Sequence, residues 1–223
     1  MGRTRGTRRR WWFATTVAVA TVAMLGTTQT SVAVDTPVIK NGGFERGTLA
    51  NWQRTGEAQG WRAVRGTSAP ISNNAIPAAP VGHWQGVVDQ NGPGSHVLYR
   101  DITLPDEQFL LSLTVWYRNH AGEFHTPRRL TVGTNENQQM RIDLVDPGAP
   151  IRSLEADDIL ANVMRTRVGD PIRMRPGEVV ADLTPYAGQT IRLRIAEVDN
   201  LSFFNVGIDA VHLVAVPCPP NCS

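Results

Sequence analysis

The residues best suited to bind a ligand are two tryptophans and three arginines spread along the chain: Trp84, Trp116, Arg118, Arg192 and Arg194. A flat aromatic ring can stack on the apolar face of a sugar, and a guanidinium can donate hydrogen bonds to hydroxyl groups. Ligand sites commonly combine apolar surface with a few such polar groups. These residue types indicate a carbohydrate-binding surface if the fold turns them outward.

Alternation of apolar and polar residues suggests which way these side chains point. Leu111, Leu113 and Val115 share one face of an expected strand, so Trp116 and Arg118 lie on the other face. Later segments place three more arginines on the non-core face in the same way: Arg141, Arg192 and Arg194. We expect these residues to form one concave face, with Trp84 as a second exposed ring. Alternatively, the long segment 119–179 folds across that face and buries it.

Recognised catalytic motifs are missing from the sequence. His120 and His125 are five residues apart, but no His-Glu-x-x-His zinc motif and no Gly-x-Ser-x-Gly elbow occurs. Among 20 acidic residues, some pair will have the separation needed for glycoside hydrolysis by chance. We therefore expect no catalytic residues and a protein that works by binding.

Short strands separated by turns account for most of the chain. Apolar residues recur at every second position around 111–117, 140–144, 191–195 and 211–213, the period of half-buried strands. One segment, 154–165, instead has apolar residues at helical spacing: Ile159, Leu160, Val163 and Met164. We expect residues 35–216 to form a single all-β antiparallel sandwich, with a long insertion that carries one short helix.

The first 33 residues have the pattern of a cleaved export signal. An arginine-rich start is followed by an apolar stretch, 11–25, and a run of small and polar residues that suits cleavage after Ala33. The apolar stretch is shorter than the ~20 residues of a membrane span. We expect a secreted, extracellular protein without membrane association. Export would use the Sec route or, given the paired arginines of 7–12, the twin-arginine route.

The formal charge of +2 comes from this leader. Five of the 22 basic residues lie in the first ten positions, so 17 basic residues remain against 20 acidic ones, a net charge of about −3. Lys40 is the only lysine. This balance argues against a nucleic-acid partner.

The two cysteines, Cys218 and Cys222, lie in a Pro-rich tail, 217–223. An export signal permits disulfides, and a bridge here would close only a small loop. The alternative is a zinc site, but two cysteines without a nearby histidine supply half of its ligands. We expect a disulfide.

The two ends of the expected sandwich carry a family resemblance. The segment from Asn41 to Trp52 reads Asn-Gly-Gly-Phe-Glu, then a glycine, a leucine and a tryptophan, and residues 208–213 read Ile-Asp-Ala-Val-His-Leu. Both resemble the opening and closing strands of carbohydrate-binding modules with the galactose-binding-like jelly roll, as found in secreted bacterial proteins. The resemblance implies a jelly-roll topology. The middle of the chain, 118–179, matches nothing in that family.

The same resemblance implies a structural calcium ion, whose matching positions here are Glu45 and Asp209. The family's second aspartate is replaced by Ala210. First and last strands pair in a jelly roll, so the two carboxylates could meet, and oxygen ligands are what Ca²⁺ requires. Alternatively, both carboxylates face solvent or pair with Arg46 or Arg194.

The sequence thus favours a secreted, non-catalytic module that binds polysaccharide or another glycan. A second hypothesis is a structural or adhesive domain whose partner is another extracellular protein, which would bury the tryptophans and expose an apolar patch elsewhere. A small secreted hydrolase is the third, and it requires a deep pocket with titratable groups of shifted pKa.

Overall fold

The computed structural model describes residues 39–56, 60–90 and 92–216. The expected export signal and the tail with Cys218 and Cys222 lie outside the described residues. Neither of the two short helices in the described part of the chain is long enough to cross a membrane.

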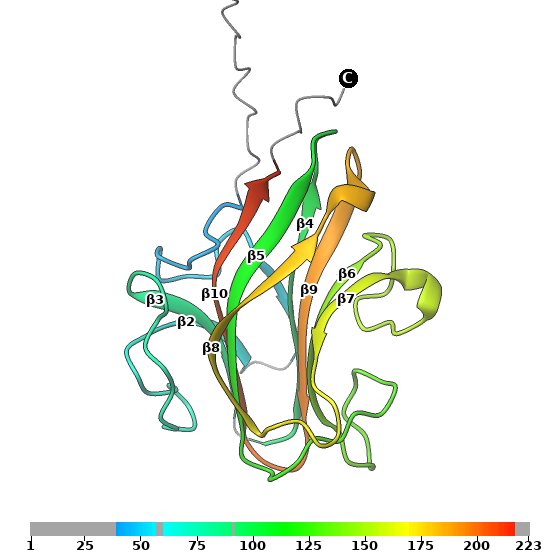
Figure 1. Cartoon of the computed structure of the whole chain (residues 1–223). Helices are drawn as coiled ribbons and strands as arrows, with labels where there is room; N and C mark the ends of the chain where they lie inside the picture. Colours follow the sequence, from blue (N-terminus) through cyan, green and yellow to red (C-terminus); the bar gives the residue numbers. More distant parts are fainter. Residues whose placement is uncertain (1–38, 57–59, 91, 217–223) are drawn as a thin grey trace, which may run out of the picture. The chain divides into compact units, whose positions relative to one another are not determined.

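Within the described residues, ten strands form two five-stranded sheets in which every pair is antiparallel (Figure 1). Sheet A has the order β1 (Gln53–Thr55), β4 (Gly94–Thr103), β9 (Thr190–Asp199), β6 (Gln138–Val145) and β7 (Ile159–Arg165). Sheet B has the order β2 (Gly60–Arg65), β3 (Trp84–Asp89), β10 (Phe204–Ala215), β5 (Phe109–Asn119) and β8 (Arg173–Asp182). The fold is the jelly-roll β-sandwich that the sequence predicts.

The main core fills the space between the two sheets, and alternating residues of the long strands build it. On β5, Leu111, Leu113 and Val115 are fully buried in this core, and Ile191 and Leu193 face them from β9. Because side chains alternate across a strand, the polar neighbours of these residues lie on the outer faces. The expected strands around 111–117, 140–144, 191–195 and 211–213 are all confirmed.

The expected helix in segment 154–165 is wrong. Only Ala156–Asp158 form a single 3₁₀ turn, and residues 159–165 form strand β7 on the edge of sheet A. Two register shifts occur where β7 pairs with β6, between Ile142 and Asp143 and between Leu144 and Val145. Each bulge moves the apolar alternation by one position, which produces a spacing that resembles a helix.

The N-terminal motif ties the start of the described chain to the last strand. Phe44 is fully buried and stacks on Trp52, with 5.6 Å between ring centroids. Asn41 donates to the carbonyl oxygens of Thr48 and Ala50 at 2.9 Å and so closes the turn between them. The Val211 amide donates to the Gly42 carbonyl at 3.1 Å, which joins this segment to β10.

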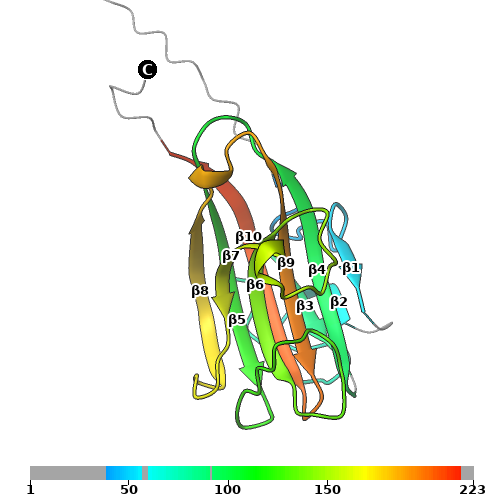
Figure 2. The same cartoon turned by 90° about the vertical axis from the view of Figure 1, so that its right-hand side faces the viewer.

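Connecting segments cover parts of both outer faces of the sandwich. On sheet B, residues Ala69 and Ile76 of the β2–β3 connection bury a second apolar cluster. On sheet A, Leu130, Ile151 and Leu154 pack on the outward side chains of β4 and β9. Figure 2 shows the β6–β7 connection, with its short helical turn, lying in front of β6 and β9. What remains open on these faces decides where a ligand can bind.

Candidate functional site

The prediction that the ligand-binding residues share one face of the sandwich is wrong. Trp116 and Arg118 lie on β5 of sheet B, whereas Arg192 and Arg194 lie on β9 of sheet A. All four do point away from the main core, as the alternation predicts. The prediction assumed that these two strands lie in the same sheet, whereas β5 and β9 belong to opposite layers of the sandwich.

Trp116 is buried, so it is not the exposed stacking platform that the sequence suggested. Its side chain is 1% exposed and packs with Ala69 and Ile76 of the β2–β3 connection. The indole nitrogen donates to Gln85 Oε1 at 2.7 Å. The covering segment therefore comes from residues 66–83, not from the long segment 119–179.

Arg118 lines a small pocket of about 200 Å³ beside the buried Trp116, together with Arg173 and Arg175. Its guanidinium donates to the Ala75 carbonyl at 3.2 Å. Trp84, the other predicted ring, is partly buried and packs against the main core. Its ring lies against Gly47, where a β-carbon would come within 3.0 Å of it.

Both arginines of β9 are engaged by carboxylates. Arg192 forms two hydrogen bonds with Asp101, at 2.6 and 2.9 Å, and lies over the Tyr99 ring. Arg194 is completely buried and donates to Asp143 at 2.7 Å. Burial lowers the pKa of Arg194, and the adjacent negative charge of Asp143 opposes that shift. Here the segment 119–179 does cover a predicted residue, since Ile151 and Ser153 lie over Arg194.

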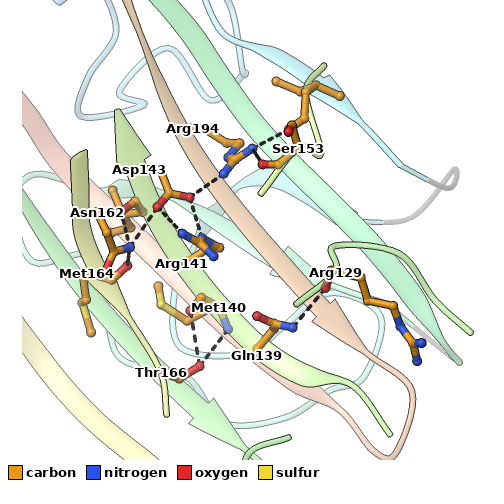
Figure 3. A network of polar contacts seen from close by, with 12 residues as sticks. Arg129, Gln139, Met140, Arg141, Asp143, Ser153, Asn162, Met164, Thr166 and Arg194 are labelled. Atoms are coloured by element: carbon orange, nitrogen blue, oxygen red, sulfur yellow. Dashed lines mark hydrogen bonds and ion pairs between the residues drawn. The ribbon is translucent and has the colours of Figure 1, made fainter. Parts of the chain in front are cut away.

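Asp143 organises a buried polar network on the outer face of sheet A (Figure 3). It is fully buried and accepts four hydrogen bonds: two from Arg141, at 2.6 and 2.8 Å, one from Arg194 at 2.7 Å and one from Asn162 at 2.9 Å. A carboxylate has about four lone-pair sites, so Asp143 is saturated. Arg194 also donates to the Ile151 and Ser153 carbonyls, at 3.0 and 2.7 Å, and thereby anchors the β6–β7 connection.

Next to this network lies a pocket with a volume of about 490 Å³. We call it the arginine pocket. Residues from β6, the end of β7 and the β5–β6 connection supply its polar lining: Arg128, Gln139, Arg141, Arg165, Thr166 and Arg167. Thr126, Pro127, Leu154 and Val168 complete it.

The floor of the arginine pocket is rigid and its rim is exposed. Gln139 and Arg141 are 5% and 8% exposed. Gln139 is fixed by donating to the Pro127 and Arg129 carbonyls at 3.0 and 3.1 Å. At the rim, the side chains of Arg165 and Arg167 are exposed. A pocket with preset polar groups on its floor can orient the hydroxyl or acidic groups of a ligand.

The polar turns at the opposite strand ends serve the fold. Asp89 is buried and accepts hydrogen bonds from the Ile71 and Ser72 amides and from Asn205 Nδ2. Asp199 accepts from the Gly94 amide at 3.1 Å. A pocket of about 370 Å³ lies beside Asp199, lined by residues 92–93 and 199–203. The carboxylates here brace turns, as their short side chains commonly do.

The two expected calcium ligands bind the same segment, 81–84: the Val81 amide donates to Asp209 at 2.9 Å, and the His83 and Trp84 amides donate to Glu45 at 2.9 Å. Asp209 is fully buried, and its pKa is raised to about 6 by burial and, to a smaller extent, by the charge of Glu45. Glu45 is exposed, and hydrogen bonds from the Trp84 and His83 amides lower its pKa.

This pair fits part of a calcium site. The charge of Glu45 contributes to the raised pKa of the buried Asp209, and Ca²⁺ is held by such carboxylate oxygens. In the described residues no three His, Cys, Asp or Glu side chains gather as a metal-binding group. Backbone carbonyls and water would therefore have to supply the remaining ligands of the six to eight that Ca²⁺ takes.

Several pocket residues carried no usable signal in the sequence. Arg141 was expected on an outer face, and it does lie there. Arg128, Arg165 and Arg167 belong to connections and strand ends. In such segments the sequence has no alternation of apolar and polar residues that would predict which way a side chain points. Their convergence depends on the pairing of β7 with β6, which the apparent helical spacing of 154–165 concealed.

No protein-family model and no curated protein sequence matches the chain. Solved structures similar to it include TmCBM61 in complex with β-1,4-galactotriose, at 15% identity and a TM-score of 0.44, with 80% of this chain and 97% of that chain covered. The K3 cleaved adhesin domain of Lys-gingipain from Porphyromonas gingivalis W83 has 12% identity and a TM-score of 0.49, covering 80% and 99%. The family 16 carbohydrate-binding module 2 has 14% identity and a TM-score of 0.43, covering 80% and 99%. Carbohydrate-binding modules and an adhesin domain are thus among the solved structures to which this chain is similar.

Proposed function

We propose that the protein is an exported, non-catalytic carbohydrate-binding domain that takes a glycan into the arginine pocket. The observation that carries this proposal is the pocket itself: two buried polar side chains, Gln139 and Arg141, form its floor between exposed arginines. Its volume of about 490 Å³ falls within the ~300–1,000 Å³ usual for ligand sites.

The mode of binding differs from the one expected from the sequence. None of the described residues that line the arginine pocket is aromatic, so we do not propose stacking on Trp116 or Trp84. Arginine and glutamine instead supply hydrogen-bond donors in fixed positions, which suit sugar hydroxyl and acidic groups. Leu154 and Val168 add a small apolar surface at the rim.

Affinity electrophoresis tests this function. The purified domain is run through gels that contain neutral or acidic soluble polysaccharides, and at least one polymer should retard it. The Arg128→Gln variant, which changes an exposed side chain of the arginine pocket, should migrate faster in that gel. The matched control, Arg175→Gln, changes an arginine of the small pocket on sheet B and should leave the retardation unchanged. Absence of retardation in every gel would refute the proposal.

We further propose that a structural Ca²⁺ ion binds at Glu45 and Asp209. A ligand that binds only the folded state, present at a free concentration of 100 times its Kd, stabilises that state by ~2.7 kcal/mol. For a domain of this size, that corresponds to an increase in melting temperature of ~5–10 °C. Calcium should produce this shift relative to chelator, and Glu45→Gln should reduce it. An equal shift in wild type and variant would place the ion elsewhere.

A further inference from the structure

The arginine pocket has an unusual charge for this chain. Excluding the leader arginines, 17 basic residues face 20 acidic ones. Yet four of the ten described residues that line the pocket are arginines, and none of these ten is acidic. Basic side chains are therefore segregated into this part of sheet A. Such a segregation produces a local positive potential on an otherwise slightly acidic domain.

The buried network beneath the pocket adds to this charge. Arg141 and Arg194 hydrogen-bond to one carboxylate, Asp143, so this buried group of three has two positive charges and one negative charge, and the charge of the half-buried Asp158 offsets part of the difference at Arg194. An uncompensated charge in a buried position is unfavourable. Asp143 has no free lone pair to offer, because it already accepts four hydrogen bonds.

Arg141 directs part of this excess toward the pocket. Its Nε and Nη2 atoms donate to Asp143, at 2.6 and 2.8 Å, whereas Nη1 donates to no atom of the described residues. Arg141 is 92% buried and lines the pocket. The two remaining Nη1 hydrogens are donors held in place by the bidentate contact on the other edge of the guanidinium. Such preset donors match the oxygens of an acidic group.

We infer that the arginine pocket recognises acidic polysaccharides through their carboxylate or sulfate groups, an inference that rests on the proposed function. The buried Arg141 contacts one acidic group, and Arg165 and Arg167 at the rim contact its neighbours. Nucleic acid fits less well, because the described part of the pocket lining has no aromatic side chain to stack on bases.

Matched pairs of polymers test the charge requirement. Binding of the domain to polygalacturonate is compared with binding to its fully methyl-esterified form, and dextran sulfate with dextran, by isothermal titration calorimetry. The acidic member of at least one pair should bind ten or more times more tightly. Which pair responds distinguishes carboxylate from sulfate. Affinity for that acidic polymer should also fall as salt is raised, because added ions screen exposed charges.

Substitutions locate the effect. The double variant Arg165→Gln/Arg167→Gln changes two exposed side chains and should lower affinity for the acidic polymer about tenfold, whereas Arg46→Gln, an exposed arginine outside the pocket, should not. Equal binding of neutral and acidic members in both pairs would overturn the acidic specificity while leaving the proposed function standing. If the domain binds neither these four polymers nor any other polysaccharide, both the acidic specificity and the proposed function are overturned. Equally tight binding to poly-glutamate would show recognition of charge without sugar and would overturn the inference.

Discussion

Replacing Asp143 by asparagine should destabilise the domain substantially. Asp143 is fully buried and accepts hydrogen bonds from two arginines and from Asn162. The substitution leaves Arg141 and Arg194 as adjacent buried cations without a bonded carboxylate, since Asp158 acts on Arg194 only through its charge. Removing one partner of a buried ion pair costs ~3–5 kcal/mol. Because asparagine keeps one acceptor oxygen, we expect the lower end, ~3 kcal/mol.

Urea unfolding and calorimetry measure this loss. A change of ~3 kcal/mol lowers the melting temperature of a domain of this size by ~6–12 °C. Asp157→Asn is the matched control, since it makes the same chemical change at an exposed residue and should shift stability by less than ~0.5 kcal/mol. Limited proteolysis should also cut the 146–158 connection faster in Asp143→Asn, because Arg194 anchors it. Stability within ~1 kcal/mol of wild type would refute the role given to Asp143.

Three further outcomes follow from other parts of the sandwich. Gly207→Ala should destabilise by ~1–3 kcal/mol in urea unfolding, because the added β-carbon would overlap the buried Trp116 ring; wild-type stability would contradict that packing. Ala210→Gly should stabilise by ~0.5–1 kcal/mol, since Ala210 has a φ of 50° in the bulge of β10; a destabilised variant would contradict the strain. Burial lowers the pKa of His120 below its usual value of 6.5, and the positive charges of Arg118 and Arg173 add to this shift. The unfolded chain therefore takes up the proton first, so stability should fall as the pH drops below about 6.5, and this fall should be smaller in His120→Asn. Identical pH profiles would contradict it.

The sequence predicts the strands well because their signal is local. Leu111, Leu113 and Val115 report a buried face through alternation alone, and Trp116 does lie opposite them. Phe44 and Trp52 of the N-terminal motif stack on each other in the core. The meeting of Glu45 with Asp209 was also foreseeable, because a jelly roll pairs its first segment with its last strand.

The binding surface could not be foreseen, because it depends on long-range pairing. Alternation shows that Trp116 and Arg194 leave the core, but it does not show that β5 and β9 belong to opposite sheets. It also carries no information about the 66–83 connection that buries Trp116. The two bulges of β7 removed the strand signal from the segment that brings Arg165 to the pocket.

The most direct test of glycan binding in the arginine pocket is to observe the arginine side chains themselves. NMR spectra of the Nε–Hε groups are recorded while trigalacturonate is titrated into the domain. We expect the signals of Arg141, Arg165 and Arg167 to shift with a common saturation curve, while those of Arg118 and Arg175 stay in place. Saturable shifts at Arg118 and Arg175, with the pocket signals unchanged, would move the binding site to sheet B and contradict the account.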